Sequence, residues 1–251
     1  MAGASPAKGG DAPGAMPTNR GNGYDVCVVG EGSGPDAKMA RPTESPRWAA
    51  GSGPVVEPGP GVGVAGHSRE LLRGALVYAA RGVPVFPCEA EGKRPLTAEG
   101  FLEATTDGAS IRRWWTRWPN ANVAIPTGKR SGLLVLDVDS GEGTDSVALL
   151  ELSRGQSPKT ARAATGGGGV HLYFRYPSPQ ELMSAGLYAR EVRNSQGLLG
   201  DGLDVRGEGG YVVAPPSSTQ RAYRWIDRSA PAGASWLLGC LRAAISGETL
   251  F

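Results

Sequence analysis

The chain has 251 residues, of which 40% are hydrophobic and 20% are charged, and its formal net charge is +2. This composition is globular, which excludes a fibrous or wholly disordered chain, and no apolar run approaches the ~20 residues of a membrane span. The small positive charge neither indicates nor excludes a nucleic-acid partner, because a binding patch would be local. The three cysteines lie far apart without metal-ligand spacing, so we expect a reducing, cytoplasmic setting. The first residues lack the basic-then-apolar order of a secretory signal, so we expect none.

The first part of the chain differs in composition from the rest. Residues 1–66 contain 15 glycines and 9 prolines and show almost no helical or strand periodicity. Such a segment buries too little apolar surface to offset its ordering entropy, so we predict a disordered tail. Glycine patterns at 30–32 and 61–66 resemble nucleotide-binding fingerprints but lack the required strand and helix around them. We therefore predict one folded domain over 67–251.

Helices and short strands alternate irregularly in the predicted domain. An apolar stripe predicts a first helix with Ser68 as its N-cap and a stop at Gly82. The other predicted elements, in chain order, are an edge strand over 83–87, a helix over 107–118, strands over 123–126 and 133–139, a helix over 146–154 capped by Asp145, a glycine loop and strand over 165–174, a loose helix and loop over 177–199, strands over 204–206 and 211–214 joined as a hairpin by 207–210, an end of the ladder at 215–217, and a helix over 236–245. Because there is no regular strand, helix, strand repeat, we predict the α+β class.

Aromatic and basic side chains in the first half allow two interpretations each. Trp114, Trp115 and Trp118 recur at helical spacing, which favours a core stripe over base stacking on a nucleic acid. The loop around Lys93 is basic, and it is either a solvated turn or a phosphate contact.

The strand over 133–139 ends in two carboxylates, Asp137 and Asp139. Successive side chains of a strand point to opposite faces, so these two acids share one face. Two neighbouring carboxylates repel one another unless a cation lies between them, and a divalent cation is their usual partner. The pattern predicts a metal-dependent site, although an Asp-x-Asp pair by itself also occurs at solvated strand ends.

Two later strands present polar side chains in the same manner. Four glycines at 166–169 precede a strand with His171 and Tyr173 on one face, and a further strand places Asp204 and Arg206 on one face. A lone histidine is often a polar core group, but the glycines before His171 permit close backbone approach and can direct amides toward an anion. His171 is therefore either a polar core group or an anion contact. Arg206 either neutralises Asp204 or reaches phosphate groups.

The order of these motifs resembles a known family. Asp-x-Asp at 137–139, Gly-Gly-x-His at 168–171 and Leu-Asp-x-Arg-Gly at 203–207 resemble the bifunctional DNA primase/polymerase (prim-pol) domain of the archaeo-eukaryotic primase superfamily. Further matching stretches lie at 82–87, 93–96, 114–115, 120–122 and 213–217, so the resemblance covers roughly residues 68–241. It implies a primase-like catalytic core, with an RRM-like sheet and an additional α/β unit.

The resemblance also implies roles for individual residues. It assigns Asp137, Asp139 and Asp204 to two Mg²⁺ or Mn²⁺ ions, and it makes His171 a contact to the incoming triphosphate. The nucleotide-binding set that we expect is His171, Arg206, Gly168, Gly169 and Lys93. The implied activity is template-directed nucleotidyl transfer from NTPs or dNTPs, for priming or extension on single-stranded DNA.

Two other functions remain open at this point. The chain could be a binding module that keeps the nucleotide pocket without transfer, or another metal-dependent phosphoryl enzyme such as a nuclease. Three intact acids favour an enzyme, since a binder gains little from uncompensated carboxylates. Family members often continue into a helicase, but no Gly-x-x-x-x-Gly-Lys-Ser/Thr loop is present, so a helicase would come in trans, from a missing part of the gene, or not at all.

Overall fold

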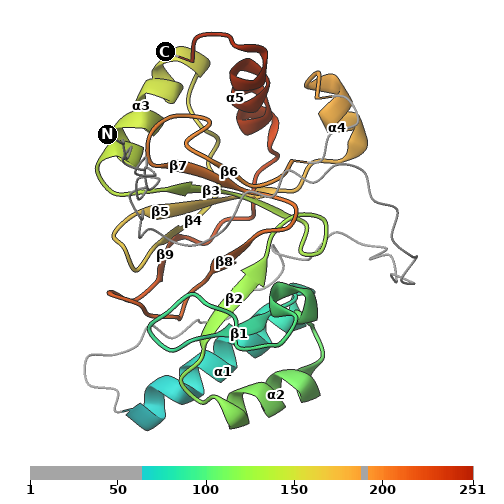
Figure 1. Cartoon of the computed structure of the whole chain (residues 1–251), viewed down its shortest axis with the longest axis vertical. Coiled ribbons are helices and arrows are strands. Elements are labelled where there is room, and N and C mark those ends of the chain that lie inside the picture. The colour runs from blue at the N-terminus through green and yellow to red at the C-terminus, as the bar shows by residue number, and fades with distance from the viewer. Residues whose placement is uncertain (1–63, 188–191, 251) are drawn as a thin grey trace, which may run out of the picture. The chain divides into compact units, whose positions relative to one another are not determined.

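The computed structural model describes residues 64–187 and 192–250 (Figure 1). All of these lie in one compact unit, Thr43–Phe251. Residues 1–63 of the predicted tail, with the glycine pattern at 30–32 and most of the pattern at 61–66, lie outside the described residues, whereas residues 64–66 belong to the first helix. Within the described part of the chain, we find no helix with both the length and the apolar character that a bilayer crossing requires.

A three-stranded antiparallel sheet forms the smaller part of the domain, and it combines two early strands with one late strand. Its order is β1-β2-β8, and its strands are β1 (Phe86–Cys88), β2 (Asn122–Pro126) and β8 (Tyr211–Val213). β1 is an edge strand, as Pro84 beside it predicted. A 3₁₀ turn, η1 (Gly100–Glu103), follows β1 in the chain.

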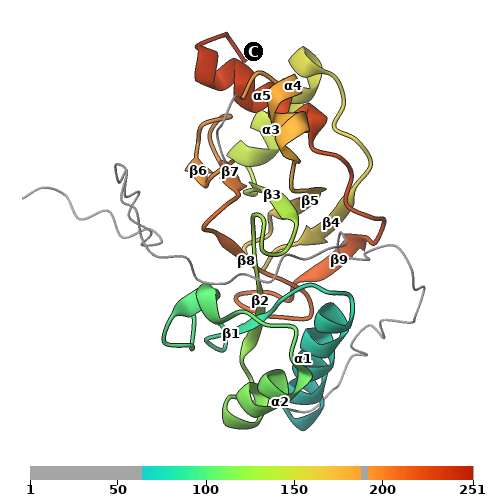
Figure 2. The same ribbon diagram turned by 90° about the vertical axis from the view of Figure 1, so that its right-hand side faces the viewer.

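Two helices pack against this sheet, α1 (Val64–Ala80) and α2 (Gly108–Arg117), and they lie side by side in both views (Figures 1 and 2). Asp107 caps α2 by accepting hydrogen bonds from the amides of Ala109 and Ser110. Trp115 is buried, and its indole N–H donates to the carbonyl of Ala121 at 3.0 Å. The tryptophan stripe therefore belongs to the core, as the sequence predicted.

A six-stranded antiparallel sheet forms the larger part of the domain. Its order is β6-β7-β3-β5-β4-β9, with β6 (Ser195–Gln196), β7 (Leu203–Arg206), β3 (Leu133–Val138), β5 (Val170–Arg175), β4 (Ala161–Ala164) and β9 (Arg224–Asp227). Helices α3 (Glu142–Arg154), α4 (Pro179–Ser184) and α5 (Ser235–Ser246) lie on one side of it (Figures 1 and 2). Leu134 and Leu136 of β3 point to this side and pack with Leu150 of α3 and Leu237 of α5.

The alternate residues of β3 point to the opposite face of the sheet. Val135 and Tyr173 lie there in one buried cluster with Leu71 of α1 and with Val123 and Ile125 of β2. The two sheets therefore share a core, and the face of β3 that carries Asp137 is the face that meets this core.

Two helices begin earlier than the sequence predicted. α1 begins at Val64, and Ser68 lies inside it, where its hydroxyl donates to Asn120 Oδ1 at 2.6 Å instead of capping the helix. α3 begins at Glu142, with Gly141 at the N-cap position, so Asp145 lies in its first turn. Both acidic side chains at the start of α3 complement the helix dipole, which compensates for the missing side-chain cap.

The predicted hairpin over 204–214 is wrong. β7 and β8 belong to different sheets, and residues 207–210 carry the chain from one sheet to the other. A glycine-rich joint indicates a change of direction but not the partner of the next strand. Strands β4 and β9 were not predicted, because β4 is rich in alanine, a poor strand former, and β9 follows the expected end of the ladder at 215–217.

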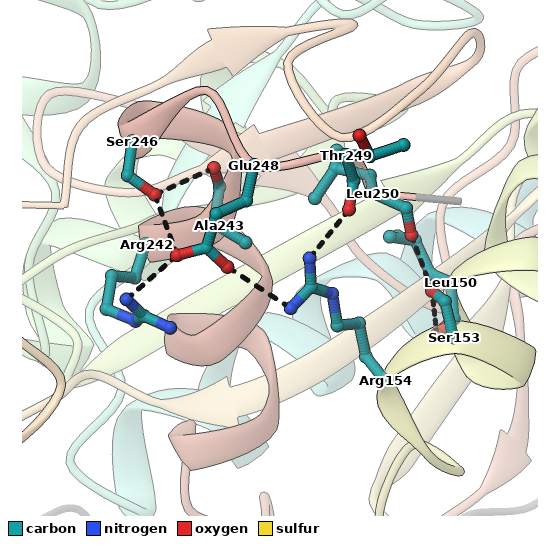
Figure 3. Close-up of polar contacts among 9 residues, drawn as sticks. All are labelled: Leu150, Ser153, Arg154, Arg242, Ala243, Ser246, Glu248, Thr249 and Leu250. Carbon is teal, nitrogen blue, oxygen red and sulfur yellow. Dashed lines mark hydrogen bonds and ion pairs between the residues drawn. The ribbon is translucent and has the colours of Figure 1, made fainter.

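A polar network fastens the end of the described chain to the helical face (Figure 3). α5 stops at Gly247, which adopts a left-handed conformation with φ 73°. Glu248 then accepts from Arg242 at 3.0 Å and lies 3.5 Å from Arg154 of α3, whose second nitrogen donates to the carbonyl of Thr249 at 2.8 Å. These contacts tie α5 to α3 on the side of the sheet away from Asp137.

Candidate active site

Strand register places the predicted polar residues in one row. In β3, Asp137 pairs directly with His171 of β5 on one side and with Asp204 of β7 on the other. Directly opposed residues on one face have Cβ atoms ~4.5–5.5 Å apart, so the three side chains are close neighbours. The next row inward contains Arg206, then Val135, then Tyr173. The predicted sharing of faces by these side chains is confirmed.

Asp137 is the most enclosed acid of the row. Its Oδ1 lies 3.3 Å from His171 Nε2 and its Oδ2 lies 3.7 Å from Arg206 Nη2, while 17% of the side chain is exposed. Burial by itself would raise the pKa of Asp137. The charge and hydrogen bond of His171, with the charges of Arg206 and Lys93, outweigh burial and lower the pKa to about 2. Asp137 is therefore ionised at neutral pH.

Asp204 is also held by Arg206, at 2.7 Å from Oδ2, and its Oδ1 accepts from the amide of Gly197 at 3.2 Å. Burial nevertheless raises the pKa of Asp204, and the negative charges of Asp137 and Asp139 add to that effect. Neighbouring acids of one row thus differ: the fold favours the charge on Asp137 and opposes the charge on Asp204.

Asp139 lies just beyond the end of β3, where its amide donates to the carbonyl of Gly202 at 2.9 Å. Its side chain is exposed, yet partial burial and the charge of Asp137 raise its pKa. Gly169 passes close beside it, since a Cβ on Gly169 would lie 2.2 Å from the carbonyl oxygen of Val138. A side chain at this glycine would separate the ends of β3 and β5.

The glycine loop before β5 uses its amides internally. Gly168 donates to the carbonyl of Thr165 at 3.0 Å, and Gly169 donates to the hydroxyl of Thr165 at 3.1 Å. Gly168 has φ 92° and is exposed, so the tip of the turn presents backbone that carries no side chain of its own. What the loop offers a ligand in this arrangement is close approach of the backbone.

His171 is buried, with 4% of its surface exposed. Its Nδ1 lies 3.3 Å from the hydroxyl of Tyr173, and its Nε2 faces Asp137. Because Asp137 is ionised, the ring carries a proton on Nε2 and donates it to this carboxylate. In this structure the imidazole therefore orients the central acid, and the contact to the incoming triphosphate that the resemblance implies stays a prediction.

Lys93 reaches the site from the other sheet. It lies in the loop after β1, where Asn122 Nδ2 donates to Gly92 O at 2.9 Å and Tyr211 donates to Lys93 O at 3.1 Å. Its ammonium group is exposed and helps to lower the pKa of Asp137. The basic loop is thus held within electrostatic reach of the acid row.

Sequence reasoning missed two residues beside the row, Arg221 and Tyr223. The ring of Tyr223 lies 6.0 Å from that of His171 between centroids, and a Cβ on Gly168 would lie 2.7 Å from a guanidinium nitrogen of Arg221. The alternation of Tyr223 with Trp225 is a strand signal that could have revealed β9. No pattern in the sequence marks Arg221.

The carboxylates have the chemistry that a hard divalent cation prefers, but in this structure they are not arranged to hold one. Carboxylate oxygens are the ligands that Mg²⁺ and Mn²⁺ prefer. Among residues 64–187 and 192–250, however, no three histidine, cysteine or acidic side chains converge closely enough to hold a metal ion. The guanidinium of Arg206 lies between Asp137 and Asp204, where such an ion would bind.

Fold and site together define a mixed α/β domain with antiparallel sheets, in which carboxylates face basic side chains, as in enzymes that act on phosphate esters. The sequence model of the N-terminal domain of bifunctional DNA primase/polymerase, Prim-Pol, matches residues 75–236, which is more than half of the 251 residues. The chain belongs to the Prim-Pol family, as its motifs predicted. No curated protein matches it.

Family membership implies a nucleotidyltransferase of the DNA primase/polymerase type, with DNA and nucleotides as substrates. It lends no support to the expected helicase partner. The α+β assignment is consistent with the antiparallel sheets.

Proposed function

We propose that the protein is a template-directed nucleotidyltransferase that synthesises primers, extends them, or does both on single-stranded DNA. The observation that carries this proposal is the row of Asp204, Asp137 and His171 across three adjacent strands, with basic side chains beside it. Family membership supplies the reaction type, and the row supplies side chains suited to it.

Within this proposal, Asp137, Asp139 and Asp204 hold two Mg²⁺ or Mn²⁺ ions. Two bound cations would supply activation of the attacking hydroxyl and neutralisation of the leaving pyrophosphate. Asp137 provides a carboxylate that is ionised over the whole physiological pH range, because its pKa is about 2. Asp139 provides an exposed carboxylate at the mouth of the row.

The triphosphate lies, in this proposal, against the basic side of the site. Lys93 contributes an exposed charge from the small sheet, and Arg206 contributes a guanidinium that can bind phosphate through two parallel hydrogen bonds. Gly168 is exposed and carries no side chain, so a phosphate can approach its backbone closely, while Gly169 supports the same turn from a buried position beside the end of β3. His171 donates either to Asp137 or to a phosphate oxygen, and a bound nucleotide decides between the two.

The test is incorporation of labelled nucleotide by the purified full chain on single-stranded DNA, with Mg²⁺ or Mn²⁺, with and without a primer, and with NTPs or dNTPs. We expect product that depends on the template and on the cation. The Asp137→Asn variant is the matched control, since it preserves side-chain volume and removes the charge. Wild-type protein that binds nucleotide but forms no product under any of these conditions would refute the proposal.

One observation favours a second candidate, a nucleotide-binding module without transfer. The carboxylates of Asp137 and Asp204 are already compensated by Arg206 in this structure, and no three acids converge among the described residues. A module of this kind would bind NTP equally well with Mg²⁺ and with EDTA. The proposed enzyme would bind it more tightly with the cation.

A further inference from the structure

Arg206 forms an ionic bridge between two strands. Its Nη2 lies 2.7 Å from Asp204 Oδ2 and 3.7 Å from Asp137 Oδ2, and the three side chains are 17–19% exposed. Asp137 and Asp204 occupy directly paired positions of β3 and β7, so their charges would repel each other without a cation. The guanidinium supplies that cation from within the protein.

The position of Arg206 in its strand explains why it turns toward the acids. It follows Asp204 by two residues and shares its face, one row further into the sheet. Its direct neighbour across the strands is Val135, which belongs to the buried apolar cluster shared by the two sheets. A charged group next to apolar neighbours extends toward the polar row, because burial without a partner is unfavourable.

We propose that Arg206 is the resident counter-ion of the metal-free site, and that it must leave Asp137 and Asp204 before a divalent cation can bind between them. This inference rests on the proposed function and adds an order of events to it. The reason is competition, since a cation shared by the two acids would bind to the same pair of carboxylates that the guanidinium now bridges. The guanidinium and the cation cannot bind the two carboxylates at the same time.

The exchange has a consequence for the nucleotide. Once released, the guanidinium can take a phosphate of the nucleotide as its new anion, which its planar fork suits. A triphosphate that attracts Arg206 frees the carboxylates, and a cation that occupies the carboxylates frees Arg206. Cation and nucleotide therefore promote each other's binding by the same factor. The bridge also keeps the acid row compact while both ligands are absent.

The test is a Mn²⁺ titration of the nucleotide-free full chain, with free Mn²⁺ measured by electron paramagnetic resonance. Arg206→Gln removes the competing charge, so we expect Mn²⁺ to bind about tenfold more tightly, the factor for loss of one charge-assisted hydrogen bond. Arg206→Lys retains a charge without the fork and should fall between Gln and wild type. Arg224→Gln is the matched control. Arg224 is exposed on β9, and its neighbour Trp225 occupies the face of His171, so Arg224 lies on the opposite face of the sheet from the acids.

The control should bind Mn²⁺ within about twofold of wild type, because only the overall charge changes. Equal or weaker Mn²⁺ binding by both Arg206 variants would overturn the inference, and so would an equal gain in the Arg224 control. If Arg206→Gln does not fold, the Lys variant decides by the same direction of change.

Failure of the inference is distinguishable from failure of the proposed function. Wild-type protein that incorporates nucleotide while Arg206→Gln binds Mn²⁺ no more tightly would refute the counter-ion role alone. Wild-type protein that binds Mn²⁺ more weakly than Arg206→Gln, yet never incorporates nucleotide, would refute the proposed function and leave the counter-ion role intact.

Discussion

Neutralising the two acids of the row should affect stability differently, with Asp137→Asn lowering it and Asp204→Asn leaving it equal or raising it, although both changes abolish the proposed transfer. Asp137→Asn removes a charge that the fold stabilises, since the pKa of Asp137 falls from 3.8 to about 2. At about 1.4 kcal/mol for each pKa unit, the ionised side chain contributes on the order of 2 kcal/mol at neutral pH. Asp204→Asn removes a charge that the fold opposes, since burial raises the pKa of Asp204.

The pH dependence follows from the same shifts. For Asp137, whose pKa is lowered on folding, the stabilisation is present above pH ~3.8 and is lost as pH falls through about 2. For Asp204, whose pKa is raised on folding, wild-type protein loses stability as pH rises past the unfolded value near 3.8. The Asp204→Asn variant should therefore equal or exceed wild type in stability at pH 7.

Urea unfolding in EDTA, followed by the fluorescence of the six tryptophans, measures both effects. At pH 7 we expect Asp137→Asn to unfold at lower urea than wild type and Asp204→Asn at the same or higher urea. The difference between Asp137→Asn and wild type should shrink as pH approaches 3. Equal destabilisation by both variants at pH 7 would show that the fold does not stabilise the charge of Asp137 while opposing the charge of Asp204.

Three further predictions concern the framework around the site. Trp115→Ala should lower the free energy of unfolding by about 3–5 kcal/mol, because the indole is buried and donates to Ala121 O; an unchanged melting temperature with weaker DNA binding would instead assign it to base stacking. Gly169→Ala should reduce both the melting temperature and nucleotide incorporation, since its Cβ would meet backbone at 2.2 Å, whereas Gly239→Ala, where a Cβ has open space, should reduce neither. Deletion of residues 1–63 should leave the thermal transition and incorporation intact, because α1 begins at Val64; loss of both would move the domain boundary toward the N-terminus.

The faces of the site strands could be predicted from the sequence, but their order could not. Period two places Asp204 with Arg206 and His171 with Tyr173, and the structure confirms both pairs. Which strand lies beside β3 depends on contacts between segments far apart in the sequence, and local composition does not encode them. The wrong hairpin at 207–210 has this cause, since the same glycines can join strands of one sheet or of two.

The partners of the charged groups were also beyond a sequence reading. Arg206 had two interpretations, because a period of two places it near Asp204 without showing whether its guanidinium turns inward or outward. Val135, the buried apolar residue paired with Arg206 across the strands, decides this in the structure, because the guanidinium turns away from it toward the acids. His171 had two interpretations for the same reason, and its contact to Asp137 follows from a pairing with β5 that only the fold specifies.

The joints between the two sheets explain why Lys93 and the acid row can act as one site. Thr127, at the end of β2, donates through its hydroxyl to Gly207 O at 2.6 Å, and its amide donates to Gly210 O at 2.8 Å. Glu208 accepts from the amide of Lys129 at 2.8 Å, so the crossing from β2 to β3 and the crossing from β7 to β8 are bonded to each other. Arg206 is the last residue of β7 and immediately precedes this joint, so the joint fixes the backbone of β7 next to the acid row. Rearrangement on ligand binding is therefore expected in side chains such as Arg206, on a backbone that the joint holds in place.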